Sequence, residues 1–139
     1  MREILFRGKR ANNRGWVEGL LFHHCEKSSS MWSDELDRAV WVDTETVGQF
    51  TGLTDKNGNR IFEGDIIRYI TPDTAKATGV VRLGEYGTGG TIGIGFYVEW
   101  AASDGAGWLR QDIGFWAKYR EIEVISNIHD NPELLPDNE

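Results

Sequence analysis

The chain has 139 residues, of which 40% are hydrophobic and 27% are charged; these fractions exclude a disordered chain and fit one folded domain. The net charge of −7 argues against broad, sequence-independent binding to DNA, because such binding draws its affinity from cations that neutralise phosphates. Cys25 is the only cysteine, so no intramolecular disulfide can form and a reducing compartment is expected.

Short strand patterns separated by turn residues fill the N-terminal part. The turn at 12–15 contains two asparagines and a glycine, which tolerate positive φ, and it joins two apolar segments into a predicted hairpin. Residues 26–38 are polar, with three consecutive serines, and predict a loop. The strands predicted in this part are Ile4–Arg7, Trp16–His23, Val40–Asp43 and Val47–Phe50.

The clearest local signal is the dipeptide Asn57-Gly58. It can supply the two positive φ angles of a type I′ turn, whose twist suits paired strands. A Gly-Asp pair then precedes the predicted strand Ile66–Ile70. Pro72 ends that strand, because proline cannot donate to a ladder.

The C-terminal part begins with the strand Val80–Leu83 and a stretch at 84–95 that contains six glycines. Alternation of isoleucine and glycine near its end predicts a strand that continues to Trp100, with bulges or close backbone contacts at the glycines. Asn131-Pro132-Glu133 predicts one helical turn, since these residues suit a helix start. The further strands predicted are Trp108–Arg110, Phe115–Ala117 and Ile122–Ile128.

About nine short strands with turns between them predict a mainly β fold. We expect a single domain over 1–139, with an SH3-like, partly open barrel over about 60–129. An N-terminal β-hairpin portion over about 1–59 would pack beside it, and a tail at 130–139 would hold the short helical turn.

The first sixteen residues carry five basic side chains and one acid, although the chain as a whole is acidic. A basic segment of this kind could contact a phosphate backbone or an acidic partner. The interpretation that we favour is a solvated strand edge that cations protect against pairing. The candidate contact residues for nucleic acid or a partner are Arg7, Lys9, Arg10, Arg14 and Trp16.

Other patterns with chemical potential are weak. His23-His24-Cys25-Glu26 has metal-ligand residue types, but only His129 could add a further imidazole and there is no second cysteine. The glycines at 87–93 superficially resemble a phosphate loop, yet a strand rather than a helix follows them, which favours a hairpin tip.

Carboxylates could in principle pair as acid and base, but nothing in their spacing selects a pair. They are Asp55, Glu63, Asp65, Asp104 and Asp112. We therefore interpret them as solvated turn acids and expect neither a metal nor a cofactor.

Three segments form a pattern that spans nearly the whole chain: Phe6-Arg7 near the start, residues 47–67 (VGQFTGLTDKNGNRIFEGDII) and residues 124–135 (VISNIHDNPELL). In order and spacing these segments resemble the YopX family of phage and prophage proteins. Ser126 stands where the family typically has glycine, and His129 stands where it has an aromatic residue. The resemblance implies a small, β-rich, phage-encoded protein and carries over no catalytic residue.

The central segment of this pattern has the chemistry of a structural signature. Its glycines can serve turns, Asp55 can bond its own backbone to fix a turn, and Asp65 precedes an apolar strand as an Asp does in SH3-like barrels. The signature residues are Gly52, Asp55, Gly58, Glu63, Gly64 and Asp65.

Three classes of function follow. The leading hypothesis is a non-catalytic interaction module of a phage or prophage that binds a protein partner, and homo-oligomerisation fits because β edges and aromatic patches associate. The alternatives are a nucleic-acid-binding β-barrel protein that uses the basic segment and Trp16, and a small metal-dependent hydrolase with a carboxylate site at Asp65. No segment has the length of a signal peptide's apolar region or a membrane span, so we expect the cytoplasm of the bacterial host and no membrane partner.

Overall fold

The computed structural model describes residues 4–11, 15–70, 76–87, 92–101, 111–119 and 121–135. Strands dominate these residues, so the predicted mainly β class is confirmed. The strands form two antiparallel sheets, and over the described ranges neither is closed into a barrel. The chain divides into two compact units, Met1–Gly52 and Leu53–Glu139. The expectation of a single domain over 1–139 stays a prediction.

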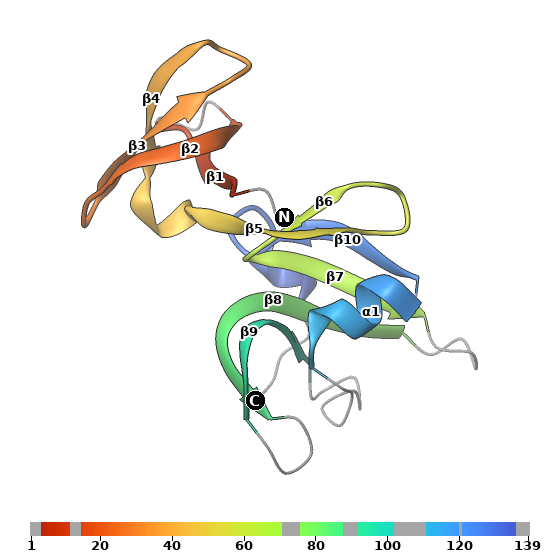
Figure 1. The fold of residues 1–139 in the computed structure, drawn as a ribbon. Coiled ribbons are helices and arrows are strands. Elements are labelled where there is room, and N and C mark those ends of the chain that lie inside the picture. Colours follow the sequence, from red (N-terminus) through yellow and green to blue (C-terminus); the bar gives the residue numbers. More distant parts are fainter. Residues whose placement is uncertain are drawn as a thin grey trace. The chain divides into compact units, whose positions relative to one another are not determined.

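The first unit contains an antiparallel meander (Figure 1). Four strands pair consecutively, and a 3₁₀ turn at Thr44–Thr46 then leads into a fifth strand, which pairs with the far side of the first. The order of the sheet is β4-β3-β2-β1-β5-β6, and its last strand, β6, belongs to the second unit. Its strands are β1 (Phe6–Lys9), β2 (Trp16–His24), β3 (Ser28–Ser33), β4 (Arg38–Asp43), β5 (Gly48–Thr54) and β6 (Arg60–Phe62).

The loop predicted over 26–38 is wrong for residues 28–33, which form β3. Ser29 and Ser33 alternate with Met31 on the buried side of the strand. The Ser29 hydroxyl lies 2.7 Å from that of Thr44, and the Ser33 hydroxyl accepts the backbone N–H of Leu36 at 3.2 Å. Because these hydrogen bonds satisfy the hydroxyl groups, serine can occupy buried positions of β3. The polar residues of this segment therefore did not indicate an exposed loop.

The second unit contains a four-stranded sheet in the order β10-β7-β8-β9. Aliphatic and aromatic side chains of these strands pack with Ile113 and Trp116 of the helix α1, which therefore covers one face of the sheet. A 3₁₀ turn at Pro132–Leu134 confirms the predicted C-terminal helical turn. The elements of this unit are β7 (Asp65–Ile70), β8 (Lys76–Gly87), β9 (Ile92–Trp100), α1 (Ile113–Tyr119) and β10 (Ile122–Asn127).

The strand predicted at Phe115–Ala117 is wrong, because these residues lie in α1. Tertiary contacts explain the difference. The ring of Trp116 is 3% exposed and its centroid lies 5.0 Å from those of both Tyr69 and Trp100. Aromatic residues favour strands on average, but here one face of a short helix brings the ring into the core.

Within the described residues, no helix is long and apolar enough to cross a membrane.

The glycine-rich stretch forms the hairpin of β8 and β9, as predicted for its described part; residues 88–91, and the predicted strand at 108–110, lie outside the described residues. Gly84 and Gly95 stand directly opposite one another with φ of 155° and 146°. Glycine adopts such angles without a steric cost. The pairing continues through this position without a register shift, and both strands curve together (Figure 1).

Candidate interaction surface

The sheet of the first unit has two chemically different faces. Side chains opposite one another in a sheet point to the same side and alternate along each strand, and the register pairs Lys9 with Trp16 and Leu20 with Trp32. The other face carries the core of the unit, formed by Val17, Met31, Val40 and Val42 with Phe6, Leu21 and Val47.

Gly8 permits the close packing of that core. A Cβ atom at this position would lie 2.9 Å from both the sulfur of Met31 and a methyl carbon of Val42. A side chain here would therefore push β1 away from its neighbours. The core face is therefore closed by tight contacts between its own side chains.

Large apolar side chains gather on this opposite face, although most apolar residues of this size are buried in folded proteins. Leu20, Phe22 and Trp41 are 53%, 54% and 60% exposed. The ring centroid of Phe22 lies 6.4 Å from that of Trp32 across the β2–β3 pair. We call this surface the aromatic face; it consists of Trp16, Leu20, Phe22, Trp32 and Trp41.

The basic candidates lie on β1 or next to it. Arg7 and Lys9 share the side of the sheet that carries the aromatic face, and the guanidinium carbon of Arg7 lies 4.9 Å from the ring centroid of Trp16, which is a cation–π distance. Arg10 forms a backbone bridge to Val42 of β4. Arg14 lies outside the described residues.

The interpretation of this segment as a protected strand edge is wrong. β1 is an interior strand, with β2 on one side and β5 on the other. Its cations therefore cannot serve to prevent pairing at an edge. They contribute instead to the surface around Trp16.

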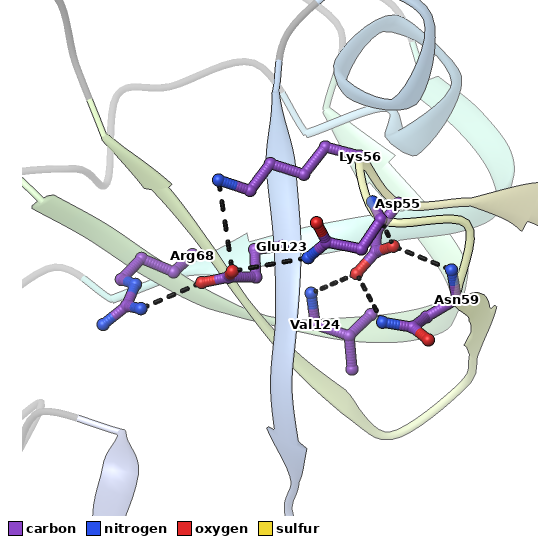
Figure 2. Close-up of polar contacts among 7 residues, drawn as sticks. Asp55, Lys56, Asn59, Arg68, Glu123 and Val124 are labelled. Atoms are coloured by element: carbon purple, nitrogen blue, oxygen red, sulfur yellow. Dashed lines mark hydrogen bonds and ion pairs between the residues drawn. The ribbon is translucent and has the colours of Figure 1, made fainter.

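The central signature forms a turn that is held by Asp55 (Figure 2). One carboxylate oxygen accepts the backbone N–H groups of Asn57 and Asn59, both at 2.9 Å. The other accepts the backbone N–H of Val124 in β10 at 2.9 Å. The backbone N–H of Lys56 also donates to the carbonyl of Ile122 at 3.1 Å, so the turn occupies the outer edge of β10.

The ionisation of Asp55 follows from these contacts. Burial by itself would raise the pKa of its carboxyl group. The donated N–H groups of Val124, Asn59 and Asn57 favour the charged form and hold the pKa below its usual value of 3.8. Asp55 is thus a charged structural residue, as the sequence predicted for its role in the turn.

The predicted type I′ turn is wrong. Gly58 has a φ of 83°, but Asn57 is not among the described residues with positive φ. The Gly58 N–H donates to the carbonyl of Asp55 at 3.1 Å, and the Asp55 N–H donates to the carbonyl of Asn59 at 2.9 Å. These bonds define a three-residue loop with glycine in the left-handed position. The loop brings the N–H groups of Asn57 and Asn59 to the Asp55 carboxylate.

Glu123 lies beside this turn and binds two cations (Figure 2). Its carboxylate accepts a hydrogen bond from Arg68 at 2.9 Å and lies 4.0 Å from the ammonium group of Lys56. The hydrogen bond from Arg68, its cross-strand partner, is the main reason that the pKa of Glu123 is lowered. This cluster is exposed and its cations are already paired, so it does not form an acid–base site.

The remaining signature residues are also structural. Gly52 and Gly64 have φ of 87° and 91°, which explains why glycine is required at both positions. Asp65 is 1% exposed, and its carboxylate accepts the backbone N–H of Phe62 at 2.7 Å. Glu63 occupies the same corner between β6 and β7. The prediction of a solvated acid is therefore wrong for Asp65, and it is also wrong for Asp55, which is 7% exposed.

The candidate metal ligands do not converge. No group of three or more His, Cys, Asp or Glu side chains in the described part of the chain could hold a metal ion. The Nδ1 atom of His24 lies 3.3 Å from the hydroxyl of Ser29, but Ser29 is fully buried and cannot reach a substrate. The candidate acid Asp104 lies outside the described residues.

Trp16 is the one residue of the aromatic face that was a contact candidate from the sequence, and the other four were missed. For Trp41 a signal was present, since it alternates with the apolar Val40 and Val42 in a predicted strand and must point away from them. For Trp32 no such signal existed, because polar neighbours suggested a loop. Phe22 lies at the register shift between Leu21 and His23, where alternation gives no guide.

Fold and signature together define a mostly β protein in which a glycine-rich, Asp-anchored turn caps one sheet and an aromatic face lies on another. The chain belongs to the YopX family: the family described as "YopX protein" matches residues 5–136. The structure is also similar to the crystal structure of protein EF1440 from Enterococcus faecalis, with a TM-score of 0.58 and 26% identity. That match covers 98% of this chain and 100% of the other. No curated protein matches.

Proposed function

We propose that this member of the YopX family is a non-catalytic interaction module of a phage or prophage, which acts in the host cytoplasm by binding a protein partner. The observation that supports this proposal most is the aromatic face. Three large apolar side chains there, Leu20, Phe22 and Trp41, are each more than half exposed. Contiguous exposed apolar surface of this kind is typical of binding sites.

The charges around the aromatic face favour a protein over a nucleic acid. Among the described residues, Arg7 and Lys9 share this side of the sheet with Glu18 and Asp43, so cations do not outnumber anions there. A nucleic-acid surface needs an excess of cations, whereas an aromatic centre with a mixed polar rim is typical of protein interfaces. We therefore expect a partner surface that is apolar at its centre and carries both signs of charge at its rim.

The experiment uses the purified full chain as bait in extracts of phage-carrying cells, followed by titration of the purified partner. Trp41→Ser and Phe22→Ser should weaken binding by about tenfold or more, as expected for central aromatic contacts. Leu134→Ser is the matched control, because Leu134 is 43% exposed and belongs to the second unit. Equal affinities for the wild type and both aromatic variants would overturn the assignment of the binding surface.

A second candidate function is binding of single-stranded nucleic acid. The cation–π contact between Arg7 and Trp16 favours it, because stacking rings beside cations suit single strands. This candidate predicts salt-sensitive binding of a labelled oligonucleotide. The binding should be lost when Arg7, Lys9, Arg10 and Arg14 are replaced together by glutamine; binding that persists in that variant contradicts it.

A further inference from the structure

The sheet of the first unit contains the same three-residue pattern twice: a tryptophan, a valine and then an acid. The pattern occurs in β2 at residues 16–18 (WVE) and in β4 at residues 41–43 (WVD). The central valine of each copy is buried in the core of the unit. Because side chains alternate along a strand, the tryptophan and the acid of each copy point together to the side that carries the aromatic face.

In the first copy, an arginine of the chain itself lies over the tryptophan. The guanidinium carbon of Arg7 lies 4.9 Å from the ring centroid of Trp16, and Arg7 stands directly opposite Glu18 in the register of β1 and β2. A planar guanidinium group can stack on an indole ring and attract a carboxylate at the same time. The first copy thus shows which kind of side chain suits this pattern.

The second copy is open by comparison. Trp41 is 60% exposed, whereas Trp16 is half-buried, and Asp43 is exposed as well. The residues opposite Trp41 and Asp43 on β3 are Ser30 and Ser28. Serine is uncharged and too short to cover an indole ring, so β3 supplies no counterpart of Arg7.

The strand β1 approaches the other side of β4 without supplying that counterpart. Arg10 forms a backbone bridge to Val42, and continuation of this register sets Lys9 beside Asp43. Within the described residues, no ion pair joins Lys9 to Asp43 and no cation–π contact involves Trp41. The indole ring and the carboxylate of the second copy can therefore receive a cation from another molecule.

We propose that Trp41 and Asp43 form a binding site for an arginine side chain of the protein partner. This inference rests on the proposed function, because it takes the partner to bind at the aromatic face. The guanidinium group lies over the ring of Trp41, as that of Arg7 lies over Trp16, and pairs with the carboxylate of Asp43. Arginine suits the site better than lysine, since an ammonium group is more strongly hydrated and has no plane to stack.

NMR titration of the full chain with a blocked arginine, N-acetyl-arginine amide, tests the site. The indole N–H signal of Trp41, assigned from its absence in Trp41→Phe, should shift, whereas blocked citrulline, which has the same shape without the charge, should leave it in place. Asp43→Asn should weaken the response by about two- to fivefold, as expected for an exposed ion pair. The matched control is Glu45→Gln, which removes an exposed acid in the adjacent 3₁₀ turn.

The two copies of the pattern also test each other. In the wild type the indole signal of Trp16 should not respond, because Arg7 covers that ring. In Arg7→Ala it should respond to blocked arginine. Silence of Trp16 in a folded Arg7→Ala variant, or a wild-type Trp41 signal that moves equally with arginine and citrulline, overturns the inference.

The outcomes separate this inference from the proposed function. If partner binding is lost in Phe22→Ser and Trp41→Ser but blocked arginine leaves the Trp41 signal in place, the arginine site is wrong and the proposed function stands. If both serine variants bind the partner as the wild type does, the proposed surface is wrong and the arginine site falls with it.

Discussion

The carboxylate of Asp55 accepts the backbone N–H of Val124 at 2.9 Å, across 69 positions of the chain. The same side chain accepts two N–H groups of its own turn. One residue therefore fixes the local shape of the turn and attaches it to β10. This dual role explains why an aspartate suits this position of the turn.

Replacing Asp55 should destabilise the protein. In Asp55→Asn, the amide NH₂ group would face backbone N–H donors, and the charge that strengthens these bonds would be lost. We expect the free energy of unfolding to fall by about 1.5–3 kcal/mol, the range for hydrogen bonds to charged groups, measured by urea denaturation at pH 7. The control is the exposed Glu121→Gln; a loss no larger than in that control would contradict this role.

Stability should also depend on pH through Asp55. Its pKa is lower in the folded protein than its usual value of 3.8, so the folded state favours the charged form more than the unfolded state does. The resulting stabilisation is fully present above the unfolded pKa of about 4 and is lost as pH falls through the folded pKa.

Urea titrations from neutral to acidic pH test this linkage. The difference in free energy of unfolding between wild type and Asp55→Asn should be constant near neutrality and shrink below pH about 4. A difference that stays constant down to the lowest pH at which both proteins fold would show that the carboxylate charge contributes nothing.

Two glycine substitutions should have opposite signs. A Cβ at either Gly58 or Gly114 would meet no atom within 4 Å, so only backbone preference matters. Gly58→Ala should cost about 1–2 kcal/mol, because φ is 83°. Gly114→Ala should stabilise by about 0.5–1 kcal/mol, because Gly114 lies in α1. Urea denaturation measures both, and equal effects would refute the argument.

The helix α1 should depend on Trp116. Its ring contacts Tyr69, Trp100 and Phe115, so Trp116→Ala should reduce the free energy of unfolding by about 3–5 kcal/mol. Phe22→Ala, at an exposed ring, should change it by less than about 0.5 kcal/mol. Similar urea midpoints for the two variants would mean that Trp116 does not anchor the helix.

Local turn chemistry was the most predictable part of the fold. Conformational preferences that depend on few neighbours belong to Asp55, to the turn glycines and to the turn at 131–133. The error at Asn57 arose because the Asp55 carboxylate selects a three-residue loop over the two-residue turn that Asn-Gly alone would favour. Side-chain hydrogen bonds of this kind are not visible in a dipeptide pattern.

The elements set by distant contacts could not be predicted. β3 depends on hydroxyl bonds such as that between Ser29 and Thr44, and α1 depends on a pocket for Trp116 between Tyr69 and Trp100. The aromatic face has the same origin, since the position of Phe22 follows from the register shift in β2 and that of Trp32 follows from the pairing of β3 with β2. In each case, contacts with residues distant in the sequence determine the structure of the element, and the element's own residues do not.

The opposed glycines of β8 and β9 separate the root of the hairpin from its outer half. Arg82 and Tyr97 stand as a pair on the root side, and Glu85 and Ile94 stand as a pair on the outer side. Because the ladder continues through the glycine pair without a break, substitutions in the outer half of the hairpin need not disturb the pairing of the inner half. The inner half, which packs in the core of the second unit through Val81 and Val98, is thus insulated from changes at the tip.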